Sequence, residues 1–178
     1  VRAVIRSGAV SPVILGVLHH GITVTDIEQS IAWYGDVLGL ELVHRQRQEN
    51  AYTPLLVGVP GAVLEVAQFR VPGPLPRVST HDLEIIQYIV GGEMHPSPVV
   101  NQVGVAHLAF LVTDIHSLHQ RAAHAGATFR NPPTEITEGA NVGGYGCYFH
   151  DPDVNTLEFI QPSPQRLGVI RSVLEGSR

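Results

Sequence analysis

Two segments far apart in the chain share one pattern of apolar and polar positions. Residues 19–26 read HHGITVTD and residues 107–114 read HLAFLVTD, so each begins with His and has Val five positions later and Asp seven positions later. In both segments a short apolar run of strand-like composition leads into a helical pattern. A repeat of this kind predicts that one supersecondary unit occurs twice in the fold.

The stretch after each apolar run has the period of an amphipathic helix. In the first copy we expect Thr25 to cap the helix, with Glu28 three residues later, and Gly39 to end it. In the second copy Thr113 is the expected cap and Gly126 the expected stop. The two predicted helices therefore correspond to each other.

The closing ends of the two copies also match, because residues 82–87 read DLEIIQ and residues 156–161 read TLEFIQ. Both strings are predicted to be final strands, and each copy has room for two more strands before them. These intermediate strands are expected at residues 40–48 and 62–71, and at residues 127–130 and 144–150. The predicted fold class is α+β, with two tandem βαβββ modules that form a curved mixed sheet.

The domain organisation follows from the limits of the repeat. The segment between the copies carries Gly and Pro residues typical of loops, and the last residues contain a short apolar pattern. We expect an N-terminal extension at 1–16, a first module at 17–90, a linker at 91–103, a second module at 104–162 and a C-terminal tail at 163–178.

Composition excludes several classes of function. The 178 residues carry 11 Lys and Arg against 16 Asp and Glu, a net charge of -5, and no run of basic residues that could form a nucleic-acid surface. The apolar start of the chain is interrupted by Arg, Gly and Pro, so no membrane segment is expected. The single Cys147 excludes an internal disulfide and favours a cytoplasmic protein.

The repeat also selects four residues as candidate metal ligands. His19 and His107 occupy matching positions at the first strand of each module, and Glu84 and Glu158 occupy matching positions on the last. Alternation along a strand places small or apolar neighbours on the same face, and a carboxylate among them is costly unless it is paired or bound to a cation. Two imidazoles and two carboxylates suit one divalent ion per chain, of Zn, Ni, Co, Mn or Fe.

Other polar residues compete with these four. His20 neighbours His19, but alternation places it on the opposite face of the strand. Glu65 competes with Glu84, although only the string around Glu84 recurs in the second copy. If Glu65 faces the cavity it is a candidate general base; an outward orientation is the alternative.

The segments LHHGITVTDIEQSIAWYGDVLGLELV and GYGCYFHDPDVNTLEFIQP resemble the glyoxalase, bleomycin-resistance and extradiol dioxygenase superfamily of vicinal oxygen chelate proteins. The resemblance implies paired modules that curl around one metal, with His19, Glu84, His107 and Glu158 as its ligands. Lactoylglutathione lyase of bacteria is similar in this ligand set, and methylmalonyl-CoA epimerase is similar in the first segment.

The resemblance implies a metal-dependent lyase or isomerase that acts on a small substrate with neighbouring oxygens through a metal-stabilised enediolate. Glu84, Glu158 or Glu65 would then move the proton as catalytic residues. An Fe(II)-dependent ring-cleaving dioxygenase and a small-molecule or antibiotic-binding protein are the alternatives. We also expect a homodimer, because such modules leave sheet edges and apolar helix faces that need cover.

Overall fold

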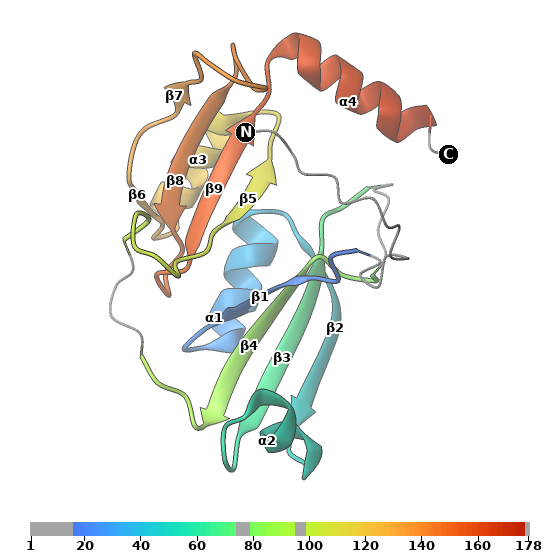
Figure 1. Cartoon of the computed structure of the whole chain (residues 1–178), viewed down its shortest axis with the longest axis vertical. Helices are drawn as coiled ribbons and strands as arrows, with labels where there is room; N and C mark the ends of the chain where they lie inside the picture. The colour runs from blue at the N-terminus through green and yellow to red at the C-terminus, as the bar shows by residue number, and fades with distance from the viewer. Residues whose placement is uncertain (1–15, 74–78, 95–98, 177–178) are drawn as a thin grey trace, which may run out of the picture.

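The strands of the protein form two mixed sheets, one from each half of the chain (Figure 1). This computed structural model describes residues 16–73, 79–94 and 99–176. Most of the expected N-terminal extension, and part of the expected linker at 91–103, lie outside the described residues. In the described parts of the chain, no helix is both long enough and apolar enough to span a membrane.

The first sheet has the strand order β1-β4-β3-β2, with β1 parallel to β4 and the other neighbours antiparallel. Its strands are β1 (His20–Thr23), β2 (Glu41–Gln48), β3 (Val63–Arg70) and β4 (Leu83–Val90). The helical segments of this half are α1 (Ile27–Ala32), the π-helical η1 (Trp33–Val37) and α2 (Tyr52–Val57). Helix α2 was not expected from the sequence.

The second sheet repeats this arrangement in the order β5-β9-β8-β6, and β7 also pairs with β8. Here β5 is parallel to β9 and β8 is antiparallel to it. The strands are β5 (Leu108–Leu111), β6 (Thr128–Phe129), β7 (Thr134–Glu135), β8 (Tyr145–His150) and β9 (Thr156–Gln161), and the helices are α3 (Ile115–His124) and α4 (Pro164–Gly176). The predicted α+β fold with two related modules is confirmed.

The helix caps lie one residue later than the sequence suggested. Asp26 caps α1, because its backbone is extended and its carboxylate accepts from the backbone N–H groups of Glu28 and Gln29. Thr25, the expected cap, instead donates its hydroxyl to Asp153 of the second module. Asp114 likewise replaces Thr113 as the cap of α3.

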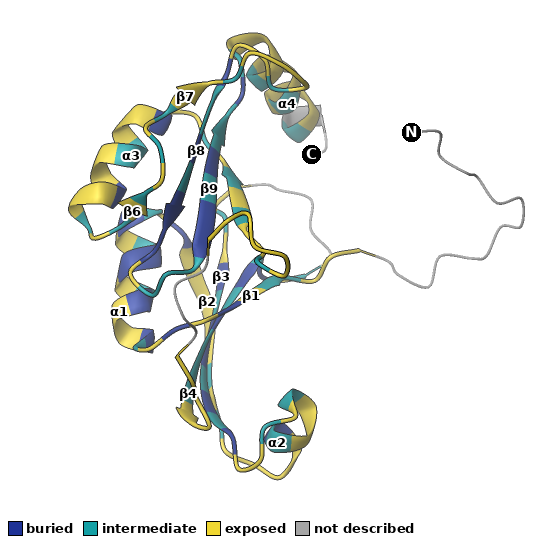
Figure 2. Ribbon diagram, turned by 60° about the vertical axis from the view of Figure 1, so that its left-hand side comes forward, coloured by how far each residue is buried: buried dark blue, intermediate teal, exposed yellow. Residues whose placement is uncertain are grey.

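Figure 2 shows α1 and α3 on one side of the two sheets and α2 and α4 on the other. Buried apolar side chains from both modules form one core on the α1 and α3 side. Two polar contacts also join the modules there: Trp33 Nε1 donates to the Ala125 carbonyl at 2.9 Å, and the buried Tyr34 hydroxyl donates to Asp151 Oδ2 at 2.7 Å. These contacts fix the modules to each other. On the opposite face of the first sheet lies a smaller apolar cluster of Ala62, Leu64 and Val66.

Candidate metal centre

The strand registers place both Glu residues on the sheet faces that point away from α1 and α3. Gly21 pairs with Glu84, and Ala109 pairs with Glu158. The residues that directly follow these Glu residues on their strands, Ile85 and Phe159, belong to the core on the helix side. Because side chains alternate along a strand, Glu84 and Glu158 occupy equivalent positions on the faces that the core leaves uncovered.

His19 and Glu84 form the first polar pair of the site. His19 Nε2 lies 3.7 Å from Glu84 Oε1, and both side chains are largely buried. Gln68, which is the register partner of Glu84 on β3, donates its amide to Glu84 Oε2 at 2.9 Å. The carboxylate of Glu84 is therefore held in a defined orientation, with one oxygen toward the imidazole.

His81 completes a cluster around this pair. His81 Nε2 lies 3.0 Å from His19 Nδ1, the two rings stack with centroids 4.9 Å apart, and the ligand atoms of His19, His81 and Glu84 all lie within 4.8 Å of one another. On its other side His81 Nδ1 contacts the Ser79 hydroxyl at 3.2 Å. Burial lowers the pKa of His81, and the neighbouring His19 lowers it further, so both favour a neutral imidazole.

His107 and Glu158 form an equivalent pair in the second module. His107 Nε2 lies 3.4 Å from Glu158 Oε2 and 3.4 Å from the Tyr148 hydroxyl. Tyr148 is the register partner of Glu158 on β8, just as Gln68 is the partner of Glu84 on β3. Burial raises the pKa of Tyr148, and the carboxylate of Glu158 raises it further, so the hydroxyl remains a hydrogen-bond donor.

The structure brings together the members of each pair but does not merge the two pairs. Among the described residues, His19, His81 and Glu84 make up the one group of three or more potential ligands with such close spacing. Near the start of β1, burial lowers the pKa of His20, and the imidazoles of His107 and His19 lower it further. Strand register places both pairs on the sheet faces that point away from α1 and α3.

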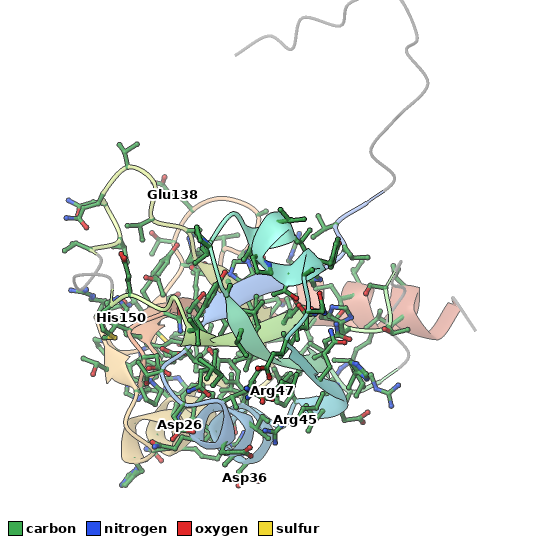
Figure 3. All side chains as sticks on the ribbon, turned by 90° about the horizontal axis from the view of Figure 1, so that it is seen from below. Asp26, Asp36, Arg45, Arg47, Glu138 and His150 are labelled. Atoms are coloured by element: carbon green, nitrogen blue, oxygen red, sulfur yellow. The ribbon has the colours of Figure 1, made fainter. Side chains whose placement is uncertain are left out.

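Glu65 is not part of this arrangement. It pairs in register with Arg47 and lies two residues before the core residue Ala67, so it is on the helix side of β3. Its carboxylate contacts Arg47 Nη1 at 3.2 Å and Arg45 Nη2 at 3.8 Å. Arg45 also forms an ion pair with Glu28 of α1, and Figure 3 shows both arginines on the side that carries Asp26. The outward orientation, which the sequence left open, is the one observed.

Sequence reasoning missed three side chains of the site: Gln68, His81 and Tyr148. Gln68 and Tyr148 lie beside the two Glu residues because of the strand register. No sequence motif marks either of them. His81 lies three residues before Glu84, but the matching position of the second copy is Asn155. The repeat therefore does not mark His81, and its place just before a closing strand is the signal that could have identified it.

The donor set of the two pairs fits a divalent metal ion. Imidazole nitrogens and carboxylate oxygens are ligands that Zn, Ni, Co, Mn and Fe accept. His81 also fits the role of a residue that orients a ligand, because a metal-binding His usually donates its other ring N–H to a neighbouring acceptor. His19 can do so through Nδ1 to His81 Nε2, which leaves His19 Nε2 directed at Glu84.

Comparisons with known proteins agree with this architecture. Residues 16–159 match the sequence pattern of the Glyoxalase/Bleomycin resistance protein/Dioxygenase superfamily. The chain belongs to this superfamily. The resemblance noted from the sequence is thereby confirmed.

Individual relatives of the superfamily give further detail. The chain is 28% identical over 153 residues to a 2-epi-5-epi-valiolone epimerase from Actinomyces sp, an alignment that covers 84% of this chain and 80% of the relative. It is similar in fold to a glyoxalase family protein from Bacillus cereus, with a TM-score of 0.72, 18% identity and coverage of 88% and 99% of the two chains. Another similar structure is a mutant of the fosfomycin resistance protein FosX from Listeria monocytogenes complexed with Mn(II), with a TM-score of 0.53, 15% identity and coverage of 86% and 97%.

The arrangement of His81 predicts the effect of removing it. His81→Ala should weaken metal affinity by about 10–100-fold, because His19 loses the partner of its second ring nitrogen. Competition with a chromogenic chelator measures this loss. His124→Ala is a matched control, since His124 is exposed on α3 and its Nδ1 contacts only the Gln120 carbonyl of its own helix. Unchanged affinity in His81→Ala would contradict the orienting role.

Proposed function

We propose that this chain is a divalent-metal-dependent epimerase, an isomerase that inverts a carbon next to a carbonyl group in a small substrate. The observation that carries the proposal is the presence of two equivalent His and Glu pairs, one on each sheet, on faces that the core leaves uncovered. The name of the Actinomyces relative supports epimerisation in preference to a lyase reaction.

One divalent ion would be held by His19, Glu84, His107 and Glu158. Such an ion polarises a bound carbonyl and makes the neighbouring C–H bond more acidic. His81 acts by orienting His19, because its two ring nitrogens are already engaged by His19 and Ser79. The Mn(II) complex of FosX supports a divalent ion in this fold.

The two carboxylates suit the proton transfers that inversion requires. A proton must leave one face of the carbon and another must arrive on the opposite face, and Glu84 and Glu158 come from different sheets. One carboxylate takes the proton as the C–H bond breaks and its electron pair moves toward the carbonyl oxygen. The other returns a proton to the opposite face as the carbonyl forms again.

A homodimer is part of the proposal. Exposed apolar side chains are found on α2 and on α4, which both project from the side of the sheets that carries the two pairs (Figure 2). Such patches are common at contacts between protein chains. These residues are Tyr52, Leu55 and Leu56 on α2, and Val169 and Val173 on α4.

Hydrogen exchange with solvent tests the proposed reaction. In deuterated water, the metal-loaded protein should incorporate deuterium at the carbon beside the carbonyl of 2-epi-5-epi-valiolone and invert that carbon. Treatment with a chelator should stop both processes, and addition of the divalent ion should restore them. Absence of exchange with this ketone, together with oxygen uptake on a catechol in the presence of Fe(II), would favour the dioxygenase reading instead.

A further inference from the structure

A cavity outside the two candidate pairs lies at the β6 edge of the second sheet, where the chain passes from α3 into β6. Its volume is about 500 Å³, which is in the range of small-molecule sites. Val154 belongs to its wall and also to that of a cavity at the seam between the modules, which Thr23 of β1 and Thr156 of β9 line. The polar side chains of the first cavity are those of Thr128, Arg130, His150 and Asp151.

Strand alternation places the basic side chains of this cavity on the sheet face that points away from α3. Phe129 and Phe149 are register partners, and their rings stack against the core on the helix side. The side chains next to them therefore point to the opposite face. Arg130 and His150 are such neighbours, and their side chains are in contact.

Arg130 also lies in one row with the second candidate pair. Its backbone N–H donates to the carbonyl of Tyr148 at 2.8 Å, and Tyr148 is the register partner of Glu158. Two strand spacings separate the backbones of Arg130 and Glu158, a distance of roughly 10 Å. The cavity is therefore on the same face as the proposed metal centre, but its residues are not the proposed ligands.

A buried histidine fixes one edge of the Arg130 guanidinium. Arg130 Nη2 donates to His150 Nε2 at 3.3 Å, and His150 is only 5% exposed. Because a guanidinium has donors only, Nε2 is the acceptor and Nδ1 carries the ring proton. Burial lowers the pKa of His150, and the charge of Arg130 lowers it further, so both favour this neutral form.

The carboxylate of Asp151 does not give this wall a negative charge directed at the cavity. Asp151 is 4% exposed, and its oxygens accept hydrogen bonds from the Tyr34 hydroxyl, the backbone N–H of Asp153, and both the backbone and the side chain of Asn155. These donors hold the carboxylate within the loop and against η1. The exposed Arg130 therefore makes the wall positive.

We propose that Arg130 and His150 form a binding site for the carboxylate or phosphate group of a small molecule. Arg130 binds the group, because a planar guanidinium offers parallel N–H donors to two oxygens. His150 positions the guanidinium, and the Thr128 hydroxyl on the same face adds a donor. The site goes beyond the proposed function and does not depend on it, because none of these residues is a proposed metal ligand.

NMR titration of the full, isotope-labelled chain with sodium acetate and with sodium phosphate tests this site. Signals of Thr128, Arg130 and His150 should shift to saturation with at least one of these salts, and sodium chloride at the same ionic strength should not shift them. A response to acetate alone identifies a carboxylate site, a response to phosphate alone identifies a phosphate site, and a response to both shows that the guanidinium accepts either group.

Arg130→Gln should lower this affinity about tenfold, since it removes charge-assisted hydrogen bonds. Arg130 is exposed, so the melting temperature should change little. Arg166→Gln is the matched control, because it removes the same charge from an exposed position on α4 and should leave the affinity unchanged.

Two substitutions of His150 separate its positioning role from its contribution to stability. His150→Gln keeps an oxygen that can accept from Arg130, whereas His150→Leu has no acceptor. Both replace a buried ring and should lower the melting temperature to a similar extent. Affinity for the anion should fall in His150→Leu and stay closer to that of the wild type in His150→Gln. Equal affinity of these two variants would overturn the positioning role.

Three results would overturn the site itself. These are equal shifts with chloride, unchanged affinity in Arg130→Gln, and shifts confined to the surroundings of the two candidate pairs. Titrations before and after treatment with a chelator should agree. A chain that shows metal-dependent deuterium exchange together with any of these three results keeps its proposed function and loses only this anion site.

Discussion

Purified His107→Ala protein is expected to hold far less than one divalent ion per chain while it remains folded. His107 contributes a ligand atom to the proposed centre, and its side chain is 45% exposed, so its removal opens no cavity in the core. The loss of metal should exceed that in His81→Ala, because a ligand is lost rather than a residue that orients one. Elemental analysis after gel filtration measures the content, and circular dichroism checks the fold.

The comparison of these two variants decides between the alternative ligand sets. His124→Ala should retain the full metal content. If His107→Ala retains it as well and His81→Ala has none, the ion is bound by His19, His81 and Glu84 alone, the close cluster of the first module. That result would remove the second pair from the metal centre.

Mixing two defective chains tests whether the two pairs of one site come from different chains of a homodimer. His19→Ala and His107→Ala each lack one ligand of a different pair. If the site forms between chains, a mixed dimer contains one intact site and regains metal, whereas a site within one chain stays defective in every combination. Light scattering on the same samples reports the dimer itself, and a monomer would contradict the proposal.

Glu158→Gln is expected to lower the rate of deuterium exchange by about 10²–10⁴-fold, the range for loss of a general base. Gln has nearly the shape of Glu but cannot accept the proton from carbon at neutral pH. Tyr148 and His107 can still contact the amide, so the structure around it should persist. The measurement is the rate of deuterium incorporation in the metal-loaded protein, together with its metal content.

Glu65→Gln is the matched control for this change. Its carboxylate contacts Arg45 and Arg47 on the helix side of β3, away from both pairs, so exchange should proceed at nearly the wild-type rate. Full turnover in Glu158→Gln and Glu84→Gln would argue against carboxylate-mediated proton transfer. A large loss in Glu65→Gln would return Glu65 to the list of catalytic candidates.

Local sequence patterns were sufficient to predict the two modules, because the periodicity of helices and strands depends on residues that are close together in the chain. The repeat around residues 19–26 and 107–114 predicted two equivalent units, and the closing strings predicted β4 and β9, whose Glu residues occupy matching registers. Small side chains were expected on the same faces as these Glu residues, and their register partners are Gly21 and Ala109. The helix caps were misplaced by one residue because Thr and Asp are both good caps and adjacent in each copy.

Contacts between distant strands and between the modules could not be predicted in this way. Gln68 and Tyr148 lie beside the two Glu residues through pairing with other strands, and His81 meets His19 across 62 positions of the chain. The tertiary fold also paired Glu65 with arginines on the helix side and left Thr156 buried without a partner at the seam. The sequence alone determined the repeated modules and which residues share a strand face, since both depend on short-range periodicity. Only the tertiary structure decided which side chains meet, because those contacts arise from the packing of strands and modules far apart in the chain.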